Sequence, residues 1–253
     1  MTAHARHALL LAGRGSAKIG RDPAQLLDAV LQPVTTLVVF GFAFGGSVAG
    51  STGAYLRDLV PGLLVQTALV ASLSAGVTLN VDAGSGVIDR FRSLPIARSA
   101  PLVGAVLAAG VRYVVAGTAL LVAAAVVGFR VQTGVLPLLA GLVLMVLTGL
   151  CLCWIPVLVG VLVRGPVAVQ GIFLALVVPL TFGSNVFVPT ASMPGWLADW
   201  SAVSPVSLLA DAMRGLLVGG PVAGPLAGGL LWLAGTVAVF FPLAVRAYRN
   251  RVE

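Results

Sequence analysis

Long apolar runs alternate with short polar segments along this chain, and the pattern predicts a bundle of membrane-spanning helices. An α-helix rises about 1.5 Å per residue, so about 20 apolar residues cross the roughly 30 Å hydrocarbon core of a bilayer. Six runs are long enough to do so. We expect spans at Leu31–Val48, Leu59–Leu79, Leu102–Phe129, Val135–Val163, Val167–Val188 and Leu226–Val245.

Composition supports a membrane protein and narrows its class. Of the 253 residues, 59% are hydrophobic and 9% are charged, whereas soluble domains have about 45–50% and about 25%. The formal charge of +7 does not indicate nucleic-acid binding, because no basic block is interleaved with aromatic residues. We therefore expect a single all-α domain over residues 1–253 that sits in a lipid bilayer and has no nucleic-acid partner.

The basic residues indicate the orientation of the bundle. When successive loops are placed on alternate sides, most Arg and Lys residues fall on one side, and basic residues that flank spans stay in the cytoplasm. Both termini are therefore predicted to be cytoplasmic. The cytoplasmic set is Arg6, Arg14, Lys18, Arg21, Arg90, Arg92, Arg98, Arg164, Arg246, Arg249 and Arg251, and the outer set is Arg57, Arg130 and Arg214.

The polar segments divide the chain between the spans. The expected order is a cytoplasmic amphipathic segment (1–30), spans one and two (31–79), a cytoplasmic turn (80–100), spans three to five (101–188), an outer segment (189–225), span six (226–245) and a cytoplasmic tail (246–253). In the first segment Arg14, Lys18 and Arg21 are spaced to share one helix face. Such a face suits either a membrane anchor or contact with a cytoplasmic partner.

The turn between spans two and three predicts a short amphipathic helix. Gly84 and Gly86 break the incoming helix, and Pro95 limits the one that follows. Between them an apolar face opposes a charged one. The apolar face comprises Val87, Ile88, Phe91 and Leu94, and the charged residues are Asp89, Arg90 and Arg92. This helix either lies on the membrane surface or fills a groove on a partner protein.

The segment Pro189–Leu217 is too polar to cross the membrane and too apolar for a free loop. Trp196 and Trp200 stand four residues apart, as interfacial anchors do on a short helix. We expect the segment to enter the outer leaflet or to lie on it, as a lid on the exit side or as plain interfacial helices. Within the third span, Arg112 either extends to the cytoplasmic headgroups or contacts a substrate.

The sequence has no motif for catalysis or nucleotide binding. It contains no Gly-x-x-x-x-Gly-Lys-Ser/Thr loop, no Gly-x-Ser-x-Gly elbow and no His-Glu-x-x-His pair. We expect no catalytic residue, no metal site and no cofactor bound by this chain. No Asp or Glu lies in mid-span, which argues against a proton- or sodium-coupled transporter. If the chain moves a solute, another polypeptide supplies the energy.

Motifs spread over nearly the whole length resemble those of a known family. They are Arg21–Pro23, Phe44–Gly46, Tyr55 with Pro61–Gly62, Gly86–Arg98, Phe187–Pro189, Met193–Leu197, Ser204–Pro205 and Ala212–Leu216. The run Gly86–Arg98 is the most specific of them. On these motifs the chain resembles the membrane subunit of type-2 ABC transporters, particularly the daunorubicin-resistance-type efflux permeases of actinobacteria.

The resemblance implies the permease of an ATP-driven exporter in the plasma membrane of a bacterium. It also implies a second permease copy, in a homodimer or a heterodimer, and two separate ABC ATPase subunits that bind ATP and Mg²⁺. The cargo would be a hydrophobic drug or an amphiphilic metabolite. The alternatives are a lipid or cell-envelope glycan as cargo, or a scaffold or sensor subunit that transports nothing.

The resemblance also assigns roles to residues. The coupling helix that docks on the ATPase falls on Gly86, Val87, Ile88, Asp89, Arg90, Phe91, Arg92, Leu94, Pro95 and Arg98. The connecting helix falls on Arg14, Lys18 and Arg21, and the outer re-entrant helices on Pro189, Met193, Pro194, Trp196, Trp200, Pro205 and Arg214. One departure is Gly110, close to where many relatives are expected to have an acid, so the resemblance gives no support to a charge pair at Arg112.

Overall fold

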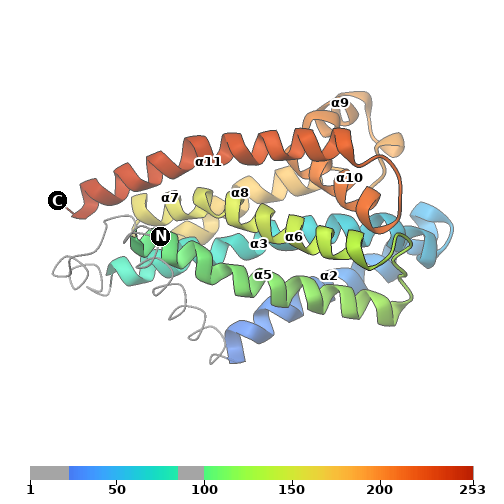
Figure 1. Cartoon of the computed structure of the whole chain (residues 1–253), viewed down its shortest axis with the longest axis horizontal. Helices are drawn as coiled ribbons and strands as arrows, with labels where there is room; N and C mark the ends of the chain where they lie inside the picture. The colour runs from blue at the N-terminus through green and yellow to red at the C-terminus, as the bar shows by residue number, and fades with distance from the viewer. Residues whose placement is uncertain (1–22, 85–99, 253) are drawn as a thin grey trace.

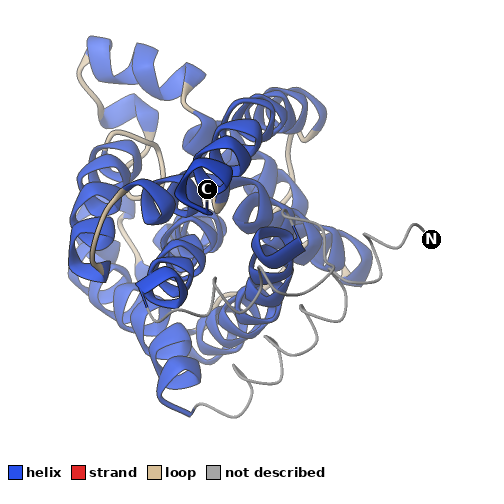
Figure 2. Cartoon of the chain, turned by 90° about the vertical axis from the view of Figure 1, so that its left-hand side faces the viewer, coloured by secondary structure: helices blue, strands red, loops and turns tan. Residues whose placement is uncertain are grey.

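The computed structural model describes residues 23–84 and 100–252, and within these ranges every regular element is a helix (Figure 1). The long helices run side by side along the long axis of the molecule, and Figure 2 views this bundle from one end. The elements are α2 (Pro23–Ala49), α3 (Thr52–Gly84), α5 (Ala100–Val127), α6 (Val135–Leu152), α7 (Trp154–Leu162), α8 (Pro166–Phe182), η1 (Thr190–Ser192), α9 (Gly195–Val203), α10 (Pro205–Leu217) and α11 (Ala223–Val252).

The two ends of the bundle hold different connections. The end of α3, the start of α5 and the end of α11 lie at one end, on the left in Figure 1, which we name the inner end after the predicted orientation. The link between α2 and α3 lies at the opposite end together with α9 and α10, and we name this the outer end. Gly84 and Ala100, which flank the expected cytoplasmic turn, and the helices of residues 189–225 therefore lie at opposite ends, as the alternation of spans predicts.

Five segments of the described chain are long and apolar enough to cross a bilayer. They are Leu27–Gly46, Thr52–Asp82, Val103–Val127, Val135–Leu162 and Ala223–Tyr248. They confirm five of the six expected spans, with boundaries that shift by several residues. The expected span Val167–Val188 is not confirmed at that length, because its helix, α8, has 17 residues and ends at Phe182.

The apolar residues after α8 pack inside the protein and do not continue the membrane-spanning helix. Gly183 follows the helix, and the chain continues through turns to Pro189. Val186 is 1% exposed and Phe187 is 6% exposed, so both side chains pack inside the protein. Because both residues are hydrophobic, they were counted in the expected fifth span. They belong instead to a loop that packs on neighbouring helices.

Helix α3 occupies the centre of the bundle. It contacts α2, α5, α6, α7, α8 and α10. Of the residues in its most apolar stretch, 61% are buried inside the protein, whereas the corresponding share for α11 is 17%. Two of its hydroxyl groups are satisfied locally, since Ser72 donates to the Leu69 carbonyl at 2.6 Å and Ser74 to the Ala71 carbonyl at 2.8 Å. These two serines can therefore be buried in an apolar helix without leaving a donor unpaired.

The fourth expected span consists of two helices, α6 and α7, which meet at Cys153. Pro156 has no N–H group and cannot donate to the Leu152 carbonyl, which interrupts the regular pattern at this point. Cys153 still donates its N–H to the Gly149 carbonyl at 3.0 Å, and its own carbonyl accepts from Val157 at 3.0 Å. The two helices therefore continue in one direction as a single membrane segment.

Helices α3 and α7 touch through their backbones. A Cβ atom on Gly76 would collide with the Pro156 carbonyl group, and one on Gly160 would collide with the Gly76 carbonyl group. Beside this contact, Asn80 donates its side-chain amide to the carbonyls of Gly160 at 2.8 Å and Val163 at 2.7 Å. These bonds join α3 to carbonyls in the last turn of α7 and just after it, where helix ends accept additional donors.

Replacing Gly76 by valine is expected to destabilise the protein by about 3 kcal/mol, because backbone atoms of α7 cannot move aside as a flexible side chain can. The measurement is the thermal midpoint of the detergent-purified protein, followed by tryptophan fluorescence. Gly171→Val is the matched control, since a Cβ at this helical glycine of α8 meets no atom within 4 Å. Equal midpoints for the two variants would contradict the backbone contact.

Candidate functional site

The coupling residues expected between Gly86 and Arg98 lie outside the described residues, as do Arg14, Lys18 and Arg21 of the expected connecting helix. Their roles therefore stay predictions. The described helices fix where the coupling segment attaches, because α3 ends at Gly84 and α5 begins at Ala100 at the same end of the bundle.

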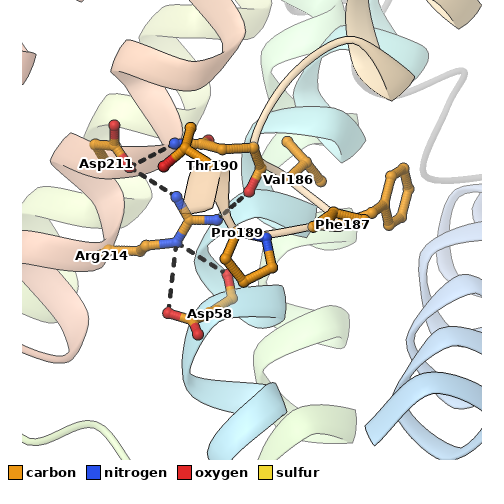
Figure 3. Close-up of a pocket in the computed structure, with 9 residues that line it drawn as sticks. Asp58, Val186, Phe187, Pro189, Thr190, Asp211 and Arg214 are labelled. Carbon is orange, nitrogen blue, oxygen red and sulfur yellow. Dashed lines mark hydrogen bonds and ion pairs between the residues drawn. The ribbon is translucent and has the colours of Figure 1, made fainter. Parts of the chain in front are cut away.

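The outer end holds a polar cluster centred on Arg214 of α10 (Figure 3). Its guanidinium donates from Nη1 to Asp211 Oδ1 at 2.7 Å and from Nε to the Asp58 carbonyl at 3.2 Å. Nη2 donates to the Asn185 carbonyl. One side chain, 18% exposed, therefore joins α3, α10 and the loop that follows α8, as only a planar group with several fixed donors can.

Asn185 links the loop to α10 by further bonds. Its backbone N–H donates to Ser207 Oγ at 3.2 Å, and its side-chain Nδ2 donates to Asp211 Oδ1 at 2.8 Å. Ser207 also shares a hydrogen bond of 2.9 Å with Ser201 of α9. The sequence produces this arrangement because Pro205 is the first residue of α10, a position that suits proline, and residues 207, 211 and 214 then follow on one helix face.

Aromatic side chains hold the same loop against α2 and α3. The hydroxyl of Tyr55 donates to the Phe187 carbonyl at 2.9 Å. The ring of Phe187 stacks on Phe40 with centroids 4.3 Å apart and on Phe182 at 5.1 Å. Gly62 permits the close approach, since a Cβ at this position would lie 3.0 Å from Val186 Cα. The loop is therefore anchored from both sides.

A cavity of about 200 Å³ opens within this cluster. Two carboxylates and one guanidinium face it, so its formal charge is −1. Figure 3 shows Asp58 and Asp211 on opposite sides of the Arg214 guanidinium. The lining residues are Asp58, Asn185, Val186, Phe187, Val188, Pro189, Thr190, Asp211 and Arg214.

The structure brings together only part of the expected outer set. Pro189 and Arg214 line the cavity, and Pro205 begins α10. Met193 and Pro194 lie between η1 and α9, and α9 carries Trp196 and Trp200 with exposed fractions of 73% and 47%. The helices α9 and α10 confirm the expected helical character of this segment, whereas its re-entry into the membrane remains a prediction.

Sequence reasoning missed the acidic half of the cluster. Asp58 and Asp211 were not among the expected site residues, although Asp211 and Arg214 are three residues apart on one helix, a spacing at which opposite charges interact. No local signal marks Asp58, because its contact with Arg214 spans 156 residues of sequence.

A separate ion pair, away from the outer cluster, joins α2 and α5. Nη2 of Arg112 donates to Asp28 Oδ2 at 2.6 Å. The Arg112 side chain is 13% exposed and that of Asp28 is 71% exposed. The sequence offered headgroups or substrate as partners for Arg112, and the resemblance gave no support to a charge pair there. The structure adds a partner that neither considered, since the acid comes from α2 and not from the neighbourhood of Gly110, and contact with headgroups or substrate stays a prediction.

The described helices and these sites define a polytopic α-helical membrane protein with a polar cluster at the outer end of its bundle. The chain matches the ABC-2 type transporter family over residues 6–218. It belongs to this family of membrane permeases.

Individual relatives are similar over most of their length. The chain is 38% identical over 231 residues to the "Daunorubicin resistance ABC transporter permease protein DrrB1" of Streptomyces coeruleorubidus, with 90% of this chain and 81% of that protein covered. It is 30% identical over 246 residues to the "Probable doxorubicin resistance ABC transporter permease protein DrrC" of Mycobacterium tuberculosis, with 96% and 88% covered. A "Putative transport permease ycf38" of Cyanophora paradoxa is 23% identical over 201 residues, with 78% and 69% covered.

Replacing Arg214 by lysine is expected to lower the free energy of unfolding by about 2 kcal/mol, because one ammonium group cannot reach three acceptors on separate elements. The thermal midpoint of the purified protein should fall by about 5 °C. Arg130→Lys is the control, since exposed Arg130 bonds only to nearby carbonyls of Ala125 and Phe129. If Arg214→Lys matches this control, the cluster does not hold the outer end together.

The pair of Asp28 and Arg112 predicts an asymmetry between single variants. Asp28→Asn leaves a largely buried guanidinium without its carboxylate, whereas Arg112→Leu leaves a carboxylate that is already exposed. We expect Asp28→Asn to be the more destabilising change, and the double variant to be no worse than Asp28→Asn alone. Thermal midpoints of the four proteins measure this cycle, and additive losses would contradict the pairing.

Proposed function

We propose that this chain is the transmembrane permease of an ATP-driven exporter that moves hydrophobic drugs or amphiphilic metabolites out of a bacterial cell. The observation that carries the proposal is the family match over residues 6–218, together with the relative named for daunorubicin resistance that covers 90% of the chain. The central helix also fits an apolar cargo, because the hydroxyl groups of Ser72 and Ser74 bond to carbonyls of their own helix.

The complete exporter would contain further copies and subunits. A second permease is part of the proposal, supported by exposed apolar side chains on α2 and α11, such as Phe42 (63% exposed) and Leu231 (75%). Two copies would enclose a path that one copy leaves open to lipid. ATP and Mg²⁺ would bind to separate ATPase subunits docked at the inner end, where Gly84 and Ala100 flank the expected coupling segment.

The proposal is tested by transport in a reconstituted system. The permease and its partner ATPase are inserted into proteoliposomes, and daunorubicin accumulation is followed by fluorescence quenching with ATP or with a non-hydrolysable analogue. We expect accumulation only with hydrolysable ATP and only with both proteins. A fluorescent phospholipid serves as a second cargo. Movement of the lipid without daunorubicin would replace the drug assignment, and ATP-independent accumulation would refute an ATP-driven exporter.

The coupling segment is tested in the same assay. Replacing Arg90 and Arg92 together by glutamate is expected to abolish ATP-dependent transport while the permease remains inserted and folded, because reversed charges would repel a partner groove that fits arginine. Arg164→Glu is the matched control, since Arg164 is exposed and lies between α7 and α8 on the same predicted side. Unchanged transport by the double variant would refute the coupling role.

A further inference from the structure

Helix α3 carries a buried polar side chain close to the segment expected to dock on the ATPase. Asn80 is 4% exposed and stands one helical turn before Gly84, the last described residue of α3. Its Nδ2 group donates to the carbonyls of Gly160 at 2.8 Å and of Val163 at 2.7 Å. A buried amide without such partners would cost free energy. These bonds therefore hold the inner end of α7 beside α3.

The carbonyls that accept from Asn80 lie where the chain turns from α7 into α8. Gly160 is in the last turn of α7, which ends at Leu162. Val163 has an extended backbone, with φ −103° and ψ 151°, and α8 begins at Pro166. Asn80 therefore ties α3 both to α7 and to the first residue of the α7–α8 turn.

The buried apolar residues near the inner end form a cluster of their own. It takes side chains from α3, α5, α7 and α11, among them Leu79, Val106, Val161 and Tyr248. The other cluster of buried apolar residues, whose last member on α3 is Leu69, includes residues of α2, α6, α8 and α10. The two helices that flank the expected coupling segment, α3 and α5, therefore share one packed body with α7 at the inner end.

We propose that Asn80 is a positioning residue for energy coupling. It holds the α7–α8 turn on the inner end of α3, so that a displacement of the expected coupling segment carries α3 and α7 together. Coupling between sites is carried by packed side chains, hydrogen bonds and rigid helices. The close approach of Gly76 and Gly160 supplies the packing, and Asn80 supplies the directional bonds. This inference rests on the proposed export function and names a residue through which the ATPase acts on the spans.

The first test uses Asn80→Leu in the reconstituted exporter. Leucine has a similar size and cannot donate, and side-chain hydrogen bonds between membrane helices contribute modestly, so the variant should stay folded. We expect basal ATP hydrolysis to persist, while the daunorubicin moved per ATP hydrolysed falls by about fivefold or more, the low end of couplings between sites. Ser72→Ala is the matched control, because the buried Ser72 hydroxyl bonds to a carbonyl of α3 itself. Its transport per ATP should equal that of the unaltered permease.

A reversible bridge separates a positioning role from a merely structural one. Asn80→Cys and Val163→Cys are combined in a permease whose two native cysteines, Cys151 and Cys153, are replaced by alanine. A short bifunctional methanethiosulfonate then joins the two introduced thiols. We expect the bridged protein to move as much daunorubicin per ATP as its alanine background, and reduction with dithiothreitol to lower this ratio as Asn80→Leu does. Because one protein supplies both states, the comparison holds even if Asn80→Leu fails to insert.

Each other outcome overturns the inference. If Asn80→Leu keeps the ratio, or lowers ATP hydrolysis and transport in proportion, Asn80 does not serve coupling. A bridge that forms but blocks transport would mean that α3 and the turn must separate during the cycle, and a bridge that never forms would contradict the contact itself. The export function is judged on the unaltered permease, where a lack of ATP-dependent transport would sink it. Full transport per ATP in Asn80→Leu would sink the role of Asn80 alone.

Discussion

The bundle depends on the backbone contact between α3 and α7. Gly76 and Gly160 let the two helices approach so closely that a single added carbon at either position would meet main-chain atoms. In a bilayer, lipid tails are as apolar as leucine, so helices associate through close packing and hydrogen bonds more than through hydrophobic burial. The contact is secured by Asn80, whose amide reaches two carbonyls of α7. Because α3 also contacts α2, α5, α6, α8 and α10, its position sets theirs.

The polar cluster at the outer end follows from a second constraint. Backbone groups that leave a helix near the hydrocarbon region need partners within the protein. After α8 ends at Phe182, the N–H of Asn185 is bonded to Ser207, the carbonyl of Asn185 to Arg214 and the carbonyl of Phe187 to Tyr55. The chain can leave its helix at this point because α3 and α10 provide these groups. The Asp58 carboxylate lies 3.9 Å from Arg214 Nε at the edge of the same cluster, as an ion pair without a hydrogen bond.

Hydropathy predicted the long helices, because these require only a long apolar run. It failed where apolar residues pack inside the protein and do not face lipid. Five spans were predictable, because a run of about 20 apolar residues has few other uses. Span five was extended too far, since Val186 and Phe187 are apolar for packing inside the protein and not for contact with lipid. The pairs of Arg112 with Asp28 and of Arg214 with Asp58 were not predictable, because the partners lie 84 and 156 residues apart in the sequence. The coupling and connecting residues remain predictions of sequence and family alone.

The length of α3 connects the two ends of the bundle physically. This helix of 33 residues bonds to Phe187 through Tyr55 and to Arg214 through Asp58 at its outer end, and to α7 through Asn80 near its inner end. Coupling between distant sites requires a contiguous and stiff element that both sites bias. The last described residue of α3, Gly84, directly precedes the segment expected to dock on the ATPase. Helix α3 is therefore a described element that connects the contacts of Tyr55 and Asp58 at the outer end with the attachment point of the coupling segment at the inner end.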